Sequence, residues 1–130
     1  MMKALVVDDS RAVRMIVSRI LKELGFEVRE AGNGKEALEQ MNQSGSPFEL
    51  VLADWNMPEV NGLELLQSIR RESRYSQVKV VMVTTETELD QMAIALASGA
   101  NEYVMKPFTK EILVEKLELA GILEERVPQQ

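Results

Sequence analysis

The chain has 130 residues, enough for one domain with a sizeable core, and 45% of them are hydrophobic. Its net charge of −6 argues against a nucleic-acid partner, we expect no signal peptide, and the sequence has no apolar run long enough to span a membrane. Because it contains neither cysteine nor histidine, disulfides, thiol chemistry and a histidine general base are excluded. We therefore expect a cytoplasmic monomer, and any metal it binds should be a hard ion with oxygen ligands.

Five short apolar runs alternate with helical patterns along the chain. The runs end near Val7, Ala31, Asp54, Thr84 and Met105. After the first run, apolar residues recur at spacings of three and four from Val13 to Leu24, which predicts an amphipathic helix. Gly25 followed by Phe26 is typical of a Schellman helix ending.

The remaining elements continue the alternation. "EVREA" reads as the second strand, and Asn33 can cap the helix after it, with Glu36 at the capping-box position. The later elements are a helix from Gly62 to about Glu72, a strand at "KVVMVTT", a helix from Leu89 that Gly99 stops, a strand at "EYVM" and a helix from Thr109 to about Gly121. Residues 124–130 are expected to be a frayed tail after a single domain of residues 1–123.

Alternating strands and helices with near-continuous apolar strands predict an α/β fold with a doubly wound parallel sheet of five strands. We expect the flavodoxin-like (βα)5 arrangement with strand order 2-1-3-4-5. In such sheets, ligands bind at the carboxyl ends of the strands, near the point where the strand order reverses.

Polar residues follow the strands at that edge. Asp8 and Asp9 follow the first strand, Asp54 the third, Thr84 ends the fourth, and Lys106 follows the fifth. Carboxylates this close raise one another's pKa unless a cation intervenes, and Mg²⁺ fits best because it uses few carboxylates and keeps waters and a phosphate oxygen. The backbone carbonyl of Asn56 is a further candidate ligand. Beside Mg²⁺, Asp54 is a candidate nucleophile toward phosphorus, with Lys106 offsetting the charge of the phosphoryl group.

The residues at these strand ends also carry a family resemblance. The stretches are "VVDDSRAVRMIV", "LKELGFEV", "LADWNMPEVNGLELL", "VVMVTTE" and "ANEYVMKPFT". They resemble the receiver domain of two-component response regulators, and among these the stand-alone chemotaxis regulators. The combination of DD, D-x-x-x-P, T and KP is specific, whereas each motif alone is weak.

The resemblance implies a role for each site residue. Asp54 would accept a phosphoryl group from a phosphohistidine on a sensor histidine kinase, and Asp9 and Asp54 would ligate Mg²⁺ directly, with Asp8 acting partly through water. Thr84 would bond a phosphoryl oxygen, and Tyr103 would turn inward on activation. The Lys106–Pro107 peptide would be cis.

The signal and its lifetime give two further expectations. A downstream protein should bind the face formed by the fourth helix, fifth strand and fifth helix, since Thr84 and Tyr103 lie on the strands beside it. Asn56 and Glu86 are expected to flank the phosphoryl group and to tune the rate of its hydrolysis. The protein would be a signalling phosphoacceptor rather than an enzyme, limited to self-phosphorylation from small donors and autodephosphorylation.

The same residues also admit other interpretations. Asp8, Asp9 and Ser10 also fit a helix cap, Asp54 a turn, Lys106 a loop lysine and Tyr103 a half-buried strand tyrosine. "GNGKEA" fits the dinucleotide motif G-x-G-x-x-A, but it follows the second strand, at the sheet edge. A phosphorelay shuttle and a flavodoxin-like nucleotide-binding or flavin-binding enzyme are therefore the alternative functions.

Overall fold

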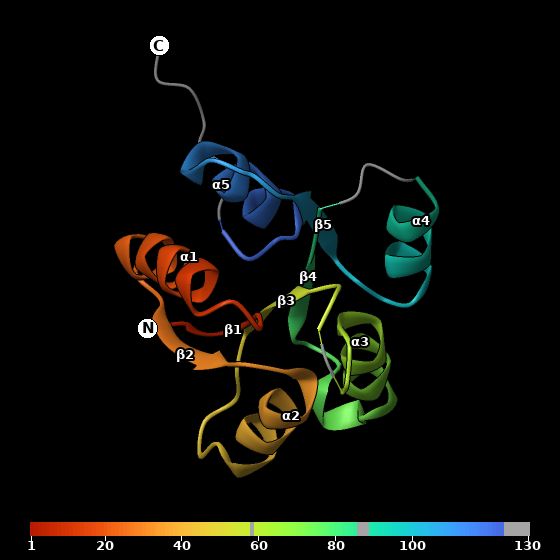
Figure 1. Cartoon of the computed structure of the whole chain (residues 1–130). Helices are drawn as coiled ribbons and strands as arrows, with labels where there is room; N and C mark the ends of the chain where they lie inside the picture. The colour runs from red at the N-terminus through yellow and green to blue at the C-terminus, as the bar shows by residue number, and fades with distance from the viewer. Residues whose placement is uncertain (58, 86–88, 124–130) are drawn as a thin grey trace.

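Five parallel strands form the sheet of the computed structural model, which describes residues 1–57, 59–85 and 89–123 (Figure 1). The strands are β1 (Lys3–Val7), β2 (Glu27–Ala31), β3 (Leu50–Asp54), β4 (Lys79–Thr84) and β5 (Glu102–Met105). Their order is β2-β1-β3-β4-β5, and every neighbouring pair is parallel. The predicted fold class and strand order are confirmed.

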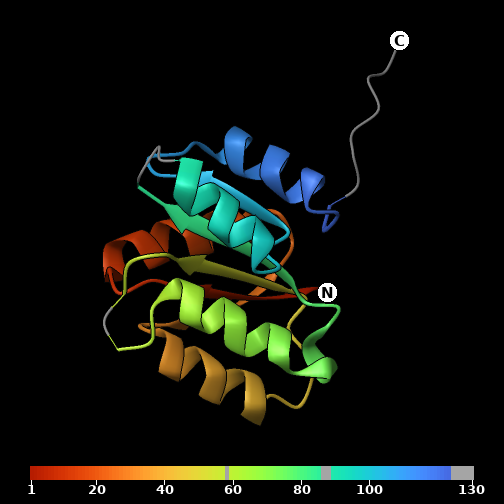
Figure 2. The same cartoon turned by 90° about the vertical axis from the view of Figure 1, so that its right-hand side faces the viewer.

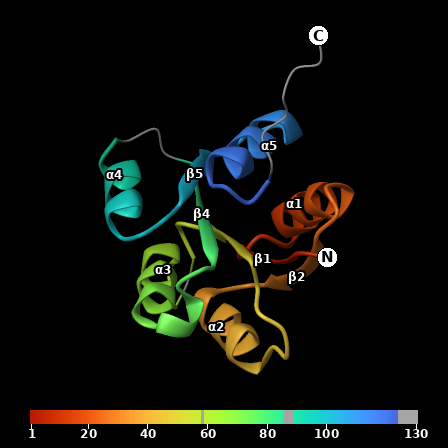
Figure 3. The same ribbon diagram turned by 180° about the vertical axis from the view of Figure 1, so that it is seen from behind.

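Helices cover both faces of this sheet. They are α1 (Arg11–Glu23), α2 (Gly34–Gln43), α3 (Gly62–Arg71), α4 (Leu89–Ala97) and α5 (Lys110–Leu119), with a short 3₁₀ helix, η1 (Ser73–Tyr75), after α3. Figures 1 and 3 show α1 and α5 on one side, and α2, α3 and α4 on the other. Figure 2 shows α4 at the end of its layer, beside β4 and β5.

Two apolar cores lie on the two faces of the sheet, because successive strand residues point to opposite sides. Leu5 and Val7 of β1 pack in the core that contains α2 and α3, whereas Ala4 and Val6 pack in the core that contains α1 and α5. All four of these side chains are buried. Burial on both faces explains why the strands read as nearly continuous apolar runs.

The helix boundaries follow the predicted capping chemistry in most places. At the end of α1, the Phe26 amide donates to the Leu21 carbonyl and the Gly25 amide to Lys22, as in a Schellman motif. Asn33 caps α2 by accepting a hydrogen bond from the Glu36 amide. The full capping box predicted there is wrong, because the Glu36 carboxylate accepts from the Gly32 amide rather than from that of Asn33.

The glycine motif at the start of α2 is occupied by the protein's own groups. The Gly32 amide donates to Glu36, and the Gly34 amide donates to the carbonyl of Val60. A Cβ atom at Gly34 would lie 2.6 Å from that same carbonyl oxygen, so the glycine permits close packing of two backbone segments. This arrangement accounts for the motif without a phosphate ligand.

A capping box does form at the start of α3, where the loop after β3 returns to the sheet. Asn61 and Glu64 bond each other's backbone amides, a pair that the sequence analysis did not identify. A Cβ atom at Gly62 would lie 2.2 Å from the carbonyl oxygen of Asp54, so only glycine fits there. The start of α3 thereby fixes the backbone of Asp54.

The other boundaries differ from the predictions by one or two residues. The fourth strand ends at Thr84, so Thr85 lies outside it, and α5 ends at Leu119. No helix among the described residues is long and apolar enough to cross a membrane. The predicted frayed tail, residues 124–130, lies outside the described residues.

Candidate functional site

Asp54 ends the central strand and is the carboxylate around which the site is arranged. It is only 6% exposed, and Asp8, one residue after the end of the neighbouring β1, is 4% exposed. Two carboxylates this deeply buried are costly unless hydrogen bonds or cations compensate them. Their shared position at the carboxyl ends of β1 and β3 is the one that the topology predicts for a ligand.

Asp9 completes a three-carboxylate cluster with this pair. Within the part of the chain that the structure describes, one oxygen atom from each of Asp8, Asp9 and Asp54 lies within 4.8 Å of the other two. Asp8 and Asp54 are buried, whereas Asp9 is exposed. An all-oxygen, strongly negative donor set open to solvent on one side suits a hard divalent cation that keeps some of its waters.

Lys106 provides the positive charge in this cluster. Its ammonium nitrogen lies 2.8 Å from Oδ2 of Asp8 and 3.5 Å from Oδ2 of Asp54. The backbone amide of Lys106 donates to the carbonyl of Thr84, which fixes the loop after β5 next to the end of β4. The sequence placed Lys106 over Asp54, but the closer partner is Asp8, and the expected cis peptide between Lys106 and Pro107 is present.

These contacts shift two ionisation equilibria. Burial, and next the charge of Asp8, raise the pKa of Asp54 above its ordinary value, and the attraction of Lys106 offsets this only in part. Burial alone would lower the pKa of Lys106, but its hydrogen bond with Asp8 and the charges of both carboxylates outweigh burial and raise it. Lys106 therefore stays an ammonium, and the ionised Asp54 lacks full compensation.

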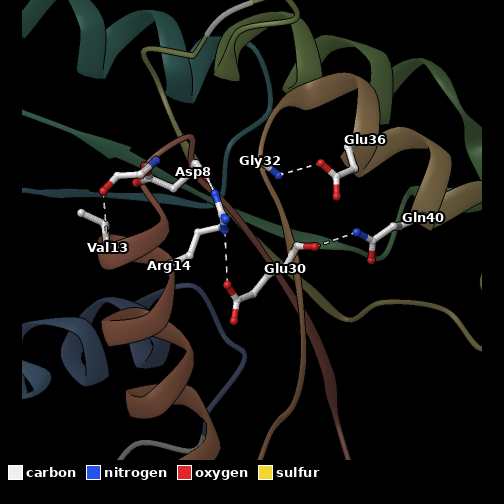
Figure 4. A network of polar contacts seen from close by, with 8 residues as sticks. Asp8, Val13, Arg14, Glu30, Gly32, Glu36 and Gln40 are labelled. Carbon is white, nitrogen blue, oxygen red and sulfur yellow. Dashed lines mark hydrogen bonds and ion pairs between the residues drawn. The ribbon is translucent and has the colours of Figure 1, made fainter.

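The backbone around Asp8 is held by a polar network that reaches from α1 to α2 (Figure 4). Arg14 donates from Nη1 to the carbonyl of Asp8 at 2.6 Å, and its Nε lies 3.3 Å from a carboxylate oxygen of Glu30 on β2. The Ser10 amide donates to Oδ1 of Asp8, and the Ser10 hydroxyl caps α1. The sequence analysis missed Arg14, whose only signal was a basic residue in the first turns of a helix that follows two aspartates.

A shallow depression of about 330 Å³ opens beside the acidic cluster. It is lined by Asp9, Trp55, Asn56, Met57 and Asn61. Asn56 is exposed and Trp55 partly so, whereas Met57 is buried in the core. The depression meets the acidic cluster at Asp9, which belongs to both and opens that side of the cluster to solvent.

The arrangement has known counterparts. The sequence matches the family described as "Response regulator receiver domain" over residues 4–118. The chain belongs to the response regulator receiver family. It is thus a two-component response regulator receiver, a class of signalling regulators rather than of classical enzymes.

Several chemotaxis regulators resemble this receiver over most of its length. Chemotaxis protein CheY1 of Helicobacter pylori is 44% identical over 119 residues, which span 91% of this chain and 95% of that protein. The Chemotaxis protein CheY homolog of Campylobacter jejuni is 44% identical over 118 residues, 90% of each chain. The solved structure of CheY4 of Vibrio cholerae superposes with a TM-score of 0.84 at 36% identity, covering 92% of this chain and 98% of that one.

Thr84, at the end of β4, is the receiver's buried hydroxyl at this edge of the sheet. It is 3% exposed, and its Oγ1 donates to Oε1 of Gln91 on α4 at 2.8 Å. Gln91 was not predicted from the sequence, because a glutamine in a helix is usually solvated and belongs here to no motif. The contact connects a side chain of α4 to the carboxyl end of β4, the strand that pairs with β3 and so lies beside the strand that ends at Asp54.

Tyr103 lies on β5, next to Met82 of β4 in the sheet register. It is half-buried against the core on the α2 and α3 side, and the ammonium of Lys116 lies 4.3 Å from its ring centroid. Its placement matches a strand tyrosine at the edge of the core. Glu86, predicted to flank the phosphoryl group, lies outside the described residues.

Proposed function

We propose that the receiver is switched by phosphorylation of Asp54 by a sensor histidine kinase. One observation carries this proposal: a buried, poorly compensated carboxylate lies among two other carboxylates and one lysine, and one of those carboxylates, Asp9, lines an open depression. In the transfer, a carboxylate oxygen of Asp54 bonds to phosphorus while the P–N bond of the donor's phosphohistidine breaks. The electron pair of that bond stays on the donor imidazole. The donor leaves as a neutral imidazole when its other ring nitrogen carries a proton.

The acidic cluster is the proposed site of a Mg²⁺ ion. Asp8, Asp9, Asp54 and the backbone carbonyl of Asn56 would hold it, and the all-oxygen donor set supports this assignment. When bound, Mg²⁺ would supply positive charge for the carboxylates and the phosphoryl oxygens. Lys106, already 3.5 Å from Asp54, would pair with one phosphoryl oxygen, and the Thr84 hydroxyl would donate to another.

The proposed output is a change at the α4-β5-α5 face. Thr84 would move toward the phosphoryl group, and Tyr103 would turn inward beside it. Each of its three elements carries exposed apolar side chains: Ile94 and Leu96 on α4, Met105 on β5 and Ile112 on α5. Exposed apolar side chains on all three elements support a protein partner there, rather than a shuttle that only passes phosphate to another histidine.

The relatives support chemotaxis as the setting, since proteins named for that process match nearly the whole chain. The lifetime of the phosphorylated state would depend on Asn56 and Glu86, which the sequence places beside the path of a hydrolytic water. The exposure of Asn56 at the rim of the depression supports its part in this assignment.

Self-phosphorylation from a small donor tests the central step. Incubation with acetyl phosphate and Mg²⁺ should add one phosphoryl mass to the protein, and peptide mapping should place it on Asp54. Asp54→Asn should abolish the label, whereas Asp90→Asn, the same change at an exposed residue of α4, should leave it intact. Labelling of Asp54→Asn at the original rate would show that the nucleophile is misassigned.

A further inference from the structure

The hydroxyl of Thr84 is already engaged in the structure described here. It donates to Oε1 of Gln91 at 2.8 Å, and this contact connects the end of β4 to the first half of α4. Thr84 is buried, whereas Gln91 is partly exposed. A threonine hydroxyl has a single proton, so it donates to one acceptor at a time.

We propose that Gln91 is a positioning residue that holds Thr84 in its resting orientation and thereby opposes the phosphorylation-dependent switch. The inference rests on the proposed function, from which it takes the role of Thr84 as a donor to the phosphoryl group. Donation to Gln91 and donation to a phosphoryl oxygen exclude each other. Each switching event therefore breaks the contact with Gln91 and releases the first half of α4 from β4.

The opposite end of α4 is held by separate contacts. Arg70 donates from Nε to the carbonyl of Gly99 at 2.8 Å and from Nη2 to Oδ1 of Asn101 at 2.9 Å. The amide of Ala100 donates back to the carbonyl of Ala95 in α4. Loss of the Gln91 contact therefore loosens α4 at one end while the other stays fixed, so the helix pivots rather than detaches.

This pivot moves the exposed apolar side chains of α4. Ile94 and Leu96 are 44% and 46% exposed and lie between Gln91 and the fixed end. Figure 2 shows α4 at the end of the layer that also contains α2 and α3. Gln91 thus couples the acidic site to the proposed partner surface.

The test measures binding of beryllofluoride, a phosphoryl mimic, in saturating Mg²⁺. Gln91→Met keeps the length of the side chain but removes the acceptor, so the donation from the buried Thr84 hydroxyl to residue 91 is lost. The affinity should rise about 2- to 12-fold, the range by which one neutral hydrogen bond changes an equilibrium constant. Gln91→Ala should also raise the affinity for the mimic. This second variant keeps the test valid if Gln91→Met fails to fold.

Two controls separate positioning from general effects. Gln91→Glu keeps an oxygen acceptor for Thr84 and should not tighten binding. Gln67→Met makes the same chemical change at an exposed position of α3 and should leave the affinity unchanged. A side chain with a purely structural role would lower the melting temperature when changed, without tightening the binding of the mimic.

A double variant places the effect on Thr84. In the Thr84→Ala background, Gln91→Met should give no further gain, and amide exchange in the first half of α4 should already be faster in Gln91→Met without the mimic. Unchanged or weaker binding by both Gln91→Met and Gln91→Ala would overturn the inference while leaving phosphorylation of Asp54 in place. Failure of the unmodified protein to bind the mimic would overturn the proposed function and the inference with it.

Discussion

Replacement of Lys106 by methionine removes the ammonium from the acidic cluster while keeping an unbranched apolar side chain. The ammonium lies 2.8 Å from Asp8 and 3.5 Å from Asp54, whose side chains are 5% and 8% exposed. Without it, Asp8 and Asp54 lose their ion pairs with Lys106, while one oxygen of each still lies within 4.8 Å of the other and of an oxygen of Asp9. We expect Lys106→Met to destabilise the metal-free protein at neutral pH.

The size of the loss follows from the burial of the pair. Removing one partner of a buried ion pair costs about 3–5 kcal/mol, because the other charge stays in the interior. Since 19% of the Lys106 side chain reaches solvent, we expect the lower value of about 2–3 kcal/mol. For 130 residues that unfold with about 2.1 cal/mol/K each, the melting temperature should fall by about 7–11 °C.

The loss should depend on pH with a defined sign. Lys106 lowers the pKa of Asp54, so the variant should have an even higher pKa at this carboxyl. A raised carboxyl pKa means that the folded protein binds a proton more tightly than the unfolded chain does. The deficit is therefore complete above the raised pKa and shrinks as the pH falls through it.

Urea unfolding monitored by Trp55 fluorescence measures these differences, in neutral and acidic buffers and with or without Mg²⁺. Mg²⁺ should restore part of the loss, because it binds the folded acidic cluster. Lys110→Met is the matched control: it removes an exposed pair with Glu23 at 2.9 Å, which solvent screens, and should therefore cost far less stability than Lys106→Met. Equal losses in both variants, or a Lys106→Met deficit indifferent to pH and Mg²⁺, would refute the assigned electrostatics.

Three further predictions concern stability and metal binding. Asp54→Asn should stabilise the metal-free protein at neutral pH, by less than Lys106→Met destabilises it, and the gain should vanish in acid as the raised pKa of Asp54 is passed; a loss of stability in urea unfolding would contradict this. Arg70→Met removes donors to the carbonyls of Gly99, Tyr75 and Val78 and should lower the free energy of unfolding by about 3–5 kcal/mol. The control Arg71→Met loses only an exposed contact with Ser68 and should lower it by less than ~1 kcal/mol. Similar losses in both variants would disprove the anchoring role of Arg70. Mg²⁺ titration should change Trp55 emission, and Asp9→Asn should weaken binding by roughly tenfold or more, because a ligand and a charge are lost together; calorimetry showing equal affinity would remove Asp9 from the site.

Much of the fold could be predicted from the sequence, because the local patterns of strands and helix ends agree with the overall topology. The second and fifth strands have their predicted bounds, and the Schellman ending at Gly25 is present as expected. The cluster of Asp8, Asp9 and Asp54 was predictable because parallel strands place their carboxyl ends at one edge. No side-chain geometry was needed for those inferences.

The sequence could not predict which of several possible hydrogen-bond partners a side chain takes. Lys106 can reach two carboxylates, and its preference for Asp8 depends on where each oxygen lies in space. Glu36 likewise bonds the amide of Gly32 rather than that of the N-cap residue Asn33, whose backbone is fully extended. Gln91 carries no pattern of its own, since its role arises from the position of α4 relative to Thr84.

The resting contacts determine how strongly phosphorylation must act under the proposed function. A phosphoryl group brings a charge of about −2, and charge-assisted hydrogen bonds from Thr84 and Lys106 would each contribute about 1.5–3 kcal/mol. Their sum of about 3–6 kcal/mol is close to the ~5.5 kcal/mol that takes a two-state equilibrium from 1:99 to 99:1. Thr84 has a single proton that is already engaged with Gln91, so its net gain is smaller, whereas the Lys106 ammonium has three protons and can keep its bond with Asp8 while it pairs with a phosphoryl oxygen. Neither bond alone reaches the ~5.5 kcal/mol of a full switch, and the resting acceptor Gln91 raises the threshold that the phosphoryl group has to overcome.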